Sequence, residues 1–265
     1  MLKNISIGQY FAGDSIIHRL DPRTKFVLTL AFIIFIFFIK TYFGYIALAA
    51  FMAMVIIFSG VPFSFILRGL KPLLAFILLT FIINVFFTTG ETVIFQLGFV
   101  KITWEALNLA IFMALRLIFL IVCTSILTLT TQPTSLTDGL ESLMRPLTRF
   151  NFPAHELAMM MTIALRFIPT LMDEADKIIK AQTARGADFT TGSLANRAKN
   201  IIPILIPLFV SAFRRAGELA NAMESRCYRG GEGRTHLKQL KMINIDYISY
   251  FMCAAFFAFV LIGGL

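Results

Sequence analysis

Long apolar segments constrain this chain more strongly than any other feature of its sequence. They cover residues 26–58, 72–87, 106–129 and 243–262 and contain few charged side chains. A helix needs about 20 apolar residues to cross the bilayer core, so the first segment is long enough for two crossings with a turn at residues 40–44. Because 58% of the 265 residues are apolar and only 15% are charged, the chain has too little polar surface to coat a soluble globule. We therefore predict an all-α polytopic membrane protein with about five transmembrane helices.

The positions of lysine and arginine predict which segments face the cytoplasm. With a cytoplasmic N-terminus, the inside segments 1–25, 59–71 and 131–242 hold about 21 of the 24 basic residues, in agreement with the positive-inside rule. Lys40 and Lys101 remain outside. This topology accounts for most of the net charge of +9. We therefore expect a multi-pass protein of the cell membrane that contacts the lipid bilayer and binds no nucleic acid.

The same topology divides the chain into four parts. A cytoplasmic segment, residues 1–25, precedes four transmembrane helices within residues 26–130. Residues 131–242 are predicted to form a cytoplasmic domain of more than a hundred residues. Residues 243–265 are predicted to form a C-terminal transmembrane helix, which carries Tyr247 near its start as an interfacial anchor.

Two shorter apolar segments inside the predicted cytoplasmic domain leave an alternative topology open. Residues 157–172 contain Arg166 and Pro169, and residues 201–213 contain two prolines. Both segments are shorter than an ordinary transmembrane span. A transmembrane hairpin made of them would place Lys177 and several further basic residues outside, against the positive-inside rule, so we favour a cytoplasmic position for both.

Two long helices of similar layout are predicted in the cytoplasmic domain. The first should have Pro153 in its first turn and end at Arg185, with Gly186 as its C-cap because glycine enters the left-handed region at little cost. The second should begin at Ser193 and end near Arg226. An arginine in a last turn suits the helix dipole, but two such ends also present two guanidinium forks that can pair with carboxylates. The repetition indicates two similar docking sites on a paired partner.

Five short motifs occur in a fixed order along the chain. They are HRLDPRTK at residues 18–25, LTLTT at 127–131, LESLMRPL at 140–147, ALRFIP at 164–169 and AQTARG at 181–186. Together with the five predicted transmembrane helices, these motifs resemble the T component of energy-coupling factor (ECF) transporters. Such transporters are vitamin and metal importers powered by ABC-type ATPases.

The resemblance implies a function for the two arginine-ended helices. They would be coupling helices that cross beneath the membrane and dock into two ABC-type ATPase subunits. The implied contacts are the two arginines and the residue on either side of each: Ala184, Arg185, Gly186, Ser225, Arg226 and Cys227. The second end departs from the Ala-Arg-Gly pattern. Because Cys227 enters the left-handed region less easily than glycine, we expect the second C-cap to shift to Gly230.

The resemblance also implies a membrane-embedded, substrate-binding S component as a partner. Its expected contacts are the apolar halves of the coupling helices, represented by Met159, Met160 and Leu205. Arg116 lies midway along a predicted span, where a charge is costly. Two explanations stay open for Arg116: a hydrogen bond between helices of this chain, or a contact with the S component.

Neither a catalytic centre nor a cofactor or metal site is predicted. The sequence has no P-loop GxxxxGK[ST], so another chain must hydrolyse ATP. The alternative function, an intramembrane hydrolase, would need a nucleophile with a base or metal ligands inside the spans, and Asn84, Arg116 and Cys123 do not form such a set. The acidic residues at 173, 174 and 176 are expected to pair with Lys177 and Lys180 on their own helix. The resemblance therefore implies that the chain transmits ATP-driven motion to the S component for micronutrient uptake.

Overall fold

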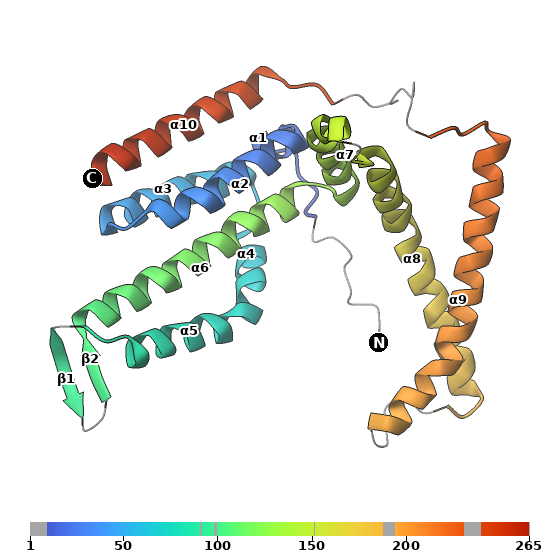
Figure 1. Cartoon of the computed structure of the whole chain (residues 1–265), viewed down its shortest axis with the longest axis horizontal. Coiled ribbons are helices and arrows are strands. Elements are labelled where there is room, and N and C mark those ends of the chain that lie inside the picture. The colour runs from blue at the N-terminus through green and yellow to red at the C-terminus, as the bar shows by residue number, and fades with distance from the viewer. Residues whose placement is uncertain are drawn as a thin grey trace. The chain divides into compact units, whose positions relative to one another are not determined.

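The computed structural model describes residues 10–90, 92–97, 100–150, 152–187, 194–230 and 240–264. In this part of the chain nearly all regular structure is helical, which confirms the all-α prediction apart from one short hairpin (Figure 1). The chain separates into two compact units. One comprises residues 8–139 and 239–265, and the other comprises residues 140–238.

The first unit contains the segments that were predicted to cross the membrane. Its helices are α1 (Ile16–Arg19), α2 (Pro22–Phe38), α3 (Tyr42–Ser59), α4 (Phe63–Leu70), α5 (Leu74–Phe87), α6 (Trp104–Thr130) and α10 (Asn244–Gly264), with a 3-10 turn, η2 (Lys71–Leu73), between α4 and α5. Helix α3, the α4–α5 segment, α6 and α10 are long and apolar enough to cross a membrane. Helix α2 has 17 residues, the lower end of the range of about 17–25 for a crossing. The crossing by α2 therefore stays a prediction.

A β-hairpin between α5 and α6 differs from the sequence prediction. Strands β1 (Val93–Leu97) and β2 (Val100–Thr103) pair antiparallel, with Val93 opposite Thr103. Valine, isoleucine, phenylalanine and threonine favour extended backbone, and the segment is too short to cross a bilayer. Thr103 then caps α6, because its hydroxyl accepts a hydrogen bond from the Ala106 N–H at 3.3 Å.

Phenylalanines from three helices form the centre of the first unit. Phe35 of α2 stacks on Phe257 of α10 with 4.0 Å between ring centroids, and Phe51 of α3 stacks on Phe256 at 4.3 Å. Phe32 contacts Phe51 at 5.1 Å. In lipid, helices associate through close packing because hydrocarbon surrounds them on all sides. These ring contacts therefore hold α2, α3 and α10 together.

A buried polar cluster joins the start of α2 to α6 and α10. Asp246 of α10 is fully buried, and its carboxylate accepts hydrogen bonds from the backbone N–H groups of Asp21 (2.9 Å) and Ile243 (2.7 Å). The ammonium of Lys25 donates to the carbonyl of Thr130, at the end of α6, at 2.9 Å. Asp21 caps α2 by accepting from the Arg23 N–H. The motif at residues 18–25 is therefore a structural junction between helices.

The second unit holds the two long helices. The boundary between the units falls within α7 (Pro133–Met144), which is followed by the 3-10 helix η3 (Arg145–Phe150), α8 (Ala154–Ala184) and α9 (Leu194–Ser225). The sequence predicted Pro153 within the first turn, but helix α8 begins at Ala154 and Pro153 is its N-cap residue. The predicted start of the second helix at Ser193 lies outside the described residues. His155 near the start of α8 contacts Glu141 of α7 at 2.8 Å, which ties these two helices together.

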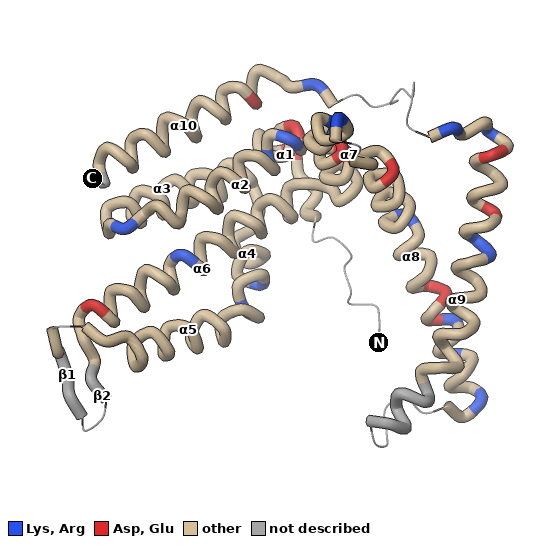
Figure 2. Tube along the Cα trace, viewed as in Figure 1, with Lys and Arg blue, Asp and Glu red and all other residues tan. Residues whose placement is uncertain are grey.

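Charged residues are distributed very unevenly between the helices. Figure 2 shows that α2, α3, α5 and α10 are uncharged over most of their length, whereas charges of both signs occur along α8 and α9. Among the helices that the structure describes, neither α8 nor α9 is apolar enough over a full span to cross a membrane.

Candidate functional site

The C-terminal end of α8 is closed by two backbone hydrogen bonds. The Gly186 N–H donates to the Thr183 carbonyl and the Ala187 N–H donates to the Gln182 carbonyl, both at 3.0 Å. This pattern is the Schellman motif, which satisfies the free carbonyls of a last helical turn. Gly186 has a φ of 89°, in the left-handed region that glycine enters readily. The predicted C-cap is confirmed.

The C-terminal end of α9 has the same motif without a glycine. The Cys227 N–H donates to the Glu224 carbonyl at 2.8 Å, and the Tyr228 N–H donates to the Met223 carbonyl at 3.0 Å. Cys227 itself is left-handed, with a φ of 56°. The prediction that the cap shifts to Gly230 is therefore wrong. The two hydrogen bonds offset a cost of roughly 1–2 kcal/mol for a residue with a Cβ in this region.

The two helix ends therefore present their arginines in the same way. Arg185 and Arg226 each occupy the last position before the left-handed residue, and both side chains are exposed, as are the neighbouring residues 184, 186, 225 and 227. Among the described residues, no carboxylate lies within ion-pair distance of either guanidinium. Both forks are free to bind an external acceptor.

Helices α8 and α9 run in opposite directions (Figure 1), so their C-terminal ends lie at opposite ends of the helix pair. The structure therefore does not bring Arg185 and Arg226 together. It also places Met160, in the first half of α8, and Leu205, in the first half of α9, on opposite sides of the crossing. The pair thus carries one arginine and one apolar half at each of its two ends.

A polar contact fixes the point where α8 and α9 cross. The Arg215 guanidinium of α9 donates to the Glu174 carboxylate of α8 at 2.7 Å, and its Nε lies 3.5 Å from the Ser211 hydroxyl. The hydrogen bond from Ser211, with a further contribution from Arg215, lowers the pKa of the Glu174 carboxyl below its ordinary value. We expected Glu174 to pair with Lys177 on its own helix, but the structure pairs it with the other helix.

An apolar groove adjoins this crossing. It has a volume of about 280 Å³ and is lined by one face of each helix: Ile163, Phe167 and Leu171 of α8, and Ala212, Arg215, Ala216, Leu219, Ala220 and Met223 of α9. The spacing of four between the α8 residues places them on one helical face. The alanines of α9 allow close approach of the two backbones. This groove and the Glu174–Arg215 pair were not found by sequence reasoning.

The first halves of α8 and α9 expose many apolar side chains. On α8 Met160 and Met161 are exposed and Met159 is half-buried. The exposed apolar side chains of α9, here called the α9 apolar face, are Ile201, Ile202, Leu205, Ile206, Phe209, Val210 and Phe213. A contiguous apolar surface of this kind marks contact with protein or lipid. The predicted contact residues Met160 and Leu205 are therefore accessible to a partner.

Arg116 lies on the surface of the first unit. Its guanidinium carbon lies 5.0 Å from the centre of the Phe37 ring of α2, and its Nη1 lies 3.6 Å from the Met113 sulfur one turn earlier on α6. Its Nε is buried and has no hydrogen-bond partner. Within the described residues, the structure thus shows no hydrogen bond from Arg116 to another helix. The first explanation for Arg116, a hydrogen bond between helices of this chain, is therefore unsupported.

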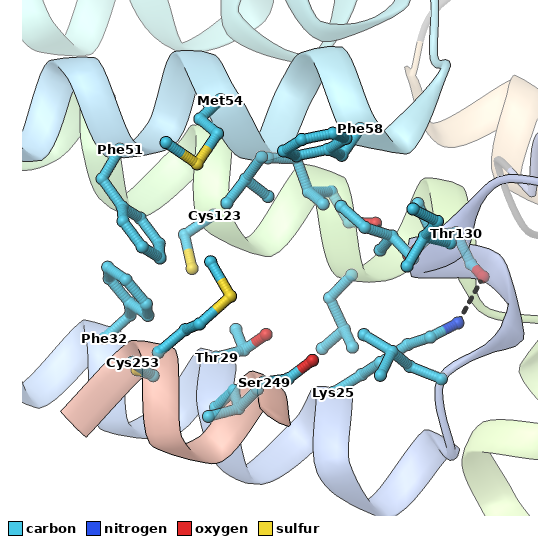
Figure 3. A pocket seen from close by; sticks show the side chains of 18 of the residues that line it. Lys25, Thr29, Phe32, Phe51, Met54, Phe58, Cys123, Thr130, Ser249 and Cys253 are labelled. Atoms are coloured by element: carbon cyan, nitrogen blue, oxygen red, sulfur yellow. Dashed lines mark hydrogen bonds between the residues drawn. The ribbon is translucent and has the colours of Figure 1, made fainter. Parts of the chain in front are cut away.

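The first unit also contains an open apolar cavity of about 380 Å³, between α1, α2, α3, α6 and α10. Figure 3 shows Phe32, Phe51, Cys123 and Cys253 around it, with the Lys25 ammonium at its edge bonded to Thr130. Ligand sites usually combine an apolar lining with a few convergent polar groups. The Lys25 ammonium is engaged by backbone carbonyls here, so the cavity offers little for recognising a polar substrate.

Comparison with known proteins connects this geometry to a family. Residues 13–237 match the family model CbiQ, described as cobalt transport protein. The chain is 54% identical over 262 residues to the energy-coupling factor transporter transmembrane protein EcfT of Ruminiclostridium cellulolyticum, covering 99% of this chain and 98% of that protein. This chain belongs to the EcfT family. Proteins of the same name from Thermosediminibacter oceani and Bacillus subtilis are 56% and 50% identical over 249 and 240 residues, with 94% and 91% of each chain covered.

Membership of the EcfT family confirms the predicted class of function. The chain is the membrane energy-coupling subunit of an ECF transporter, and it works within a membrane complex with other ECF components. It is a multi-pass transport component rather than an enzyme. The comparisons give no support to the intramembrane-hydrolase alternative.

Proposed function

We propose that the two ends of the α8–α9 pair dock into two ABC-type ATPase subunits, with one arginine in each. The observation that carries this proposal is the repeated helix end. Arg185 and Arg226 precede the same Schellman motif, both are exposed, and they lie at opposite ends of an antiparallel pair. Because the two helix ends are similar and lie at opposite ends of the pair, each can contact one of two similar ATPase subunits. Arginine suits the contact because its planar fork binds a carboxylate through two hydrogen bonds.

Removal of both arginines tests this proposal. Truncation of one partner of a buried charge pair costs roughly 2–5 kcal/mol of binding free energy. We therefore expect Arg185→Ala with Arg226→Ala to abolish ATP-driven uptake and to release the ATPase subunits during purification. The matched control is Lys180→Ala with Arg229→Ala, which removes two exposed basic side chains near the same helix ends. Normal uptake and normal ATPase retention in the arginine variant would contradict the proposal.

We further propose that the N-terminus and the α8–α9 pair face the cytoplasm. The positive charge of this region supports the assignment. Cys227 is the one exposed cysteine of the three, since Cys123 and Cys253 are buried. A membrane-impermeant maleimide should therefore label the native protein only after the cells are permeabilised. Thr89→Cys, in a Cys227→Ser background, should be labelled on intact cells, and labelling of Cys227 from outside would reverse the topology.

We also propose that the apolar halves of α8 and α9 bind a membrane-embedded S component that holds the substrate. The exposed apolar surface at Met160 and along the α9 apolar face supports this role. Because the two halves lie on opposite sides of the crossing, Met160→Asp and Leu205→Asp should be tested separately as well as together. We expect the pair to release the S component and to keep the ATPases. Retention of the S component by the double variant would contradict this assignment.

A further inference from the structure

Arg116 is a charged residue at the middle of an apolar helix. It lies 12 residues after Trp104 and 14 before Thr130, or about 18 Å and 21 Å along α6. A basic residue near the end of a span can reach the interface by snorkelling, but one at the centre of a core about 30 Å thick is far from both headgroup layers. The charge needs an acceptor at the same depth, because a guanidinium stays protonated in proteins.

The described residues of this chain do not provide that acceptor. Their three ion pairs are Arg23–Asp21, His155–Glu141 and Arg215–Glu174, and none involves Arg116. Among the described residues, the guanidinium of Arg116 contacts the Phe37 ring and the Met113 sulfur, which are both weak acceptors. Arg116 is also absent from the lining of the apolar cavity. Its charge is therefore neither paired within the bundle nor directed into that cavity.

The surroundings of Arg116 are open to another membrane helix. Phe37 is 53% exposed and Met113 is 36% exposed, so the side chains that hold the guanidinium lie on the outer surface of the bundle. Arg116 itself is half-buried, with its Nε buried and its guanidinium next to Phe37 and Met113. A planar guanidinium in such a position matches a carboxylate, which accepts two parallel hydrogen bonds.

We propose that Arg116 binds a carboxylate carried by a membrane-spanning helix of the S component. This inference rests on the proposed function, because it takes the S component as the membrane partner, and it assigns the chemistry of one contact. The depth of Arg116 favours a protein carboxylate over a lipid phosphate, since the phosphate would have to leave the headgroup layer and move to mid-membrane. The contact would fix the depth and rotation of the S component against α2 and α6, while the apolar halves of the coupling helices supply buried area.

Purification of the complex from native membranes tests the inference. Arg116→Leu removes the charge and makes the helix more apolar, so insertion should not suffer, and ATPase retention reports that the subunit is intact. We expect Arg116→Leu to weaken S-component binding by roughly 30-fold or more, because the partner carboxylate loses its counter-ion. Arg116→Lys should restore part of the binding. The matched control is Thr124→Val on the same helix, since the Thr124 hydroxyl donates only to backbone carbonyls of α6.

A second measurement identifies what lies against Arg116. A photo-crosslinking amino acid at Met113, one turn from Arg116, should form an adduct with the S component. Adducts with lipid alone would overturn the inference, and so would full S-component retention by Arg116→Leu. These two outcomes leave the proposed function standing as long as the unmodified protein retains an S component. If the unmodified protein retains none, the proposed function fails together with the inference.

Discussion

Glu174 and Arg215 meet at 2.7 Å, and their positions in α8 and α9 are equivalent. They are 41 residues apart, which is also the separation of Arg185 and Arg226. Each member of the pair precedes the terminal arginine of its own helix by 11 residues, or about 16 Å. The ion pair thus lies on an approximate two-fold axis that relates the two helix ends.

The first prediction concerns the crossing itself. Glu174→Arg should reduce coupled uptake strongly, because it places two guanidinium groups in contact at the crossing. The exchange Glu174→Arg with Arg215→Glu should recover much of the uptake, since it restores an opposite-charge pair. Asp173→Arg, at a neighbouring exposed position, is the control for added charge. ATP-driven uptake in whole cells is the measurement, and equal loss in the single and exchanged variants would refute a role for the pair.

The second prediction is the pH dependence of the same contact. The pKa of Glu174 is lowered in the folded protein, chiefly by the hydrogen bond from Ser211. A carboxyl with a lowered folded pKa stabilises the fold at every pH above its unfolded pKa, and this contribution is lost as the pH falls through the lowered value. The stability difference between the native protein and Glu174→Gln should therefore be constant near neutral pH and shrink in acid. Thermal unfolding over a pH series checks it, and a difference that grows in acid would contradict the assignment.

The third prediction separates the two left-handed positions. Cys227→Gly should stabilise the end of α9 by about 1 kcal/mol, because glycine adopts a positive φ without the Cβ penalty. Gly186→Val should destabilise the end of α8, since its φ of 89° is strained for any side chain even where space is open. Hydrogen exchange at the capping amides of residues 186, 187, 227 and 228 measures both effects. Slower exchange in Gly186→Val would disprove this account of the helix ends.

The fourth prediction concerns the junction at Asp246. Asp246→Ala leaves the buried N–H of Asp21 and the partly buried N–H of Ile243 without their acceptor, which costs about 1–3 kcal/mol for the buried group. We expect a clearly lower midpoint of thermal unfolding in detergent. Asp246→Asn keeps one acceptor oxygen and should lose less, and Asp138→Ala, at an exposed position, should change little. Equal midpoints for Asp246→Ala and Asp138→Ala would exclude a structural role.

Several features of the fold were predictable because they depend on local chemistry. The apolar length of α3, α6 and α10 is a property of each segment alone, since transfer into lipid depends on a helix's own side chains. The end of α8 was predictable for a similar reason, because Gly186 suits a left-handed C-cap wherever the helix lies. The hairpin before α6 was missed because its short apolar strands have no distinct signal between two spans.

The candidate site was predictable only in part. The arginines at both helix ends were visible in the sequence, but the identical caps were not, because cysteine rarely adopts a positive φ. Two hydrogen bonds at the end of α9 outweigh that preference at Cys227. The equal spacing of Glu174 and Arg215 from the terminal arginines was a signal that could have revealed the crossing, but Lys177 offered Glu174 a nearer partner along the chain.

Sequence alone was sufficient for the membrane class, the approximate positions of the long helices and the glycine that ends α8, because hydropathy and helix capping act over one segment at a time. Only the tertiary structure settled the antiparallel crossing of α8 and α9, the pairing of Glu174 with Arg215 and the outward position of Arg116. Those features depend on which faces of distant helices pack together. Helix packing brings Glu174 against Arg215, which is 41 residues away in the sequence. Lys177 lies only one turn from Glu174 on the same helix, yet it is not the partner that the structure shows.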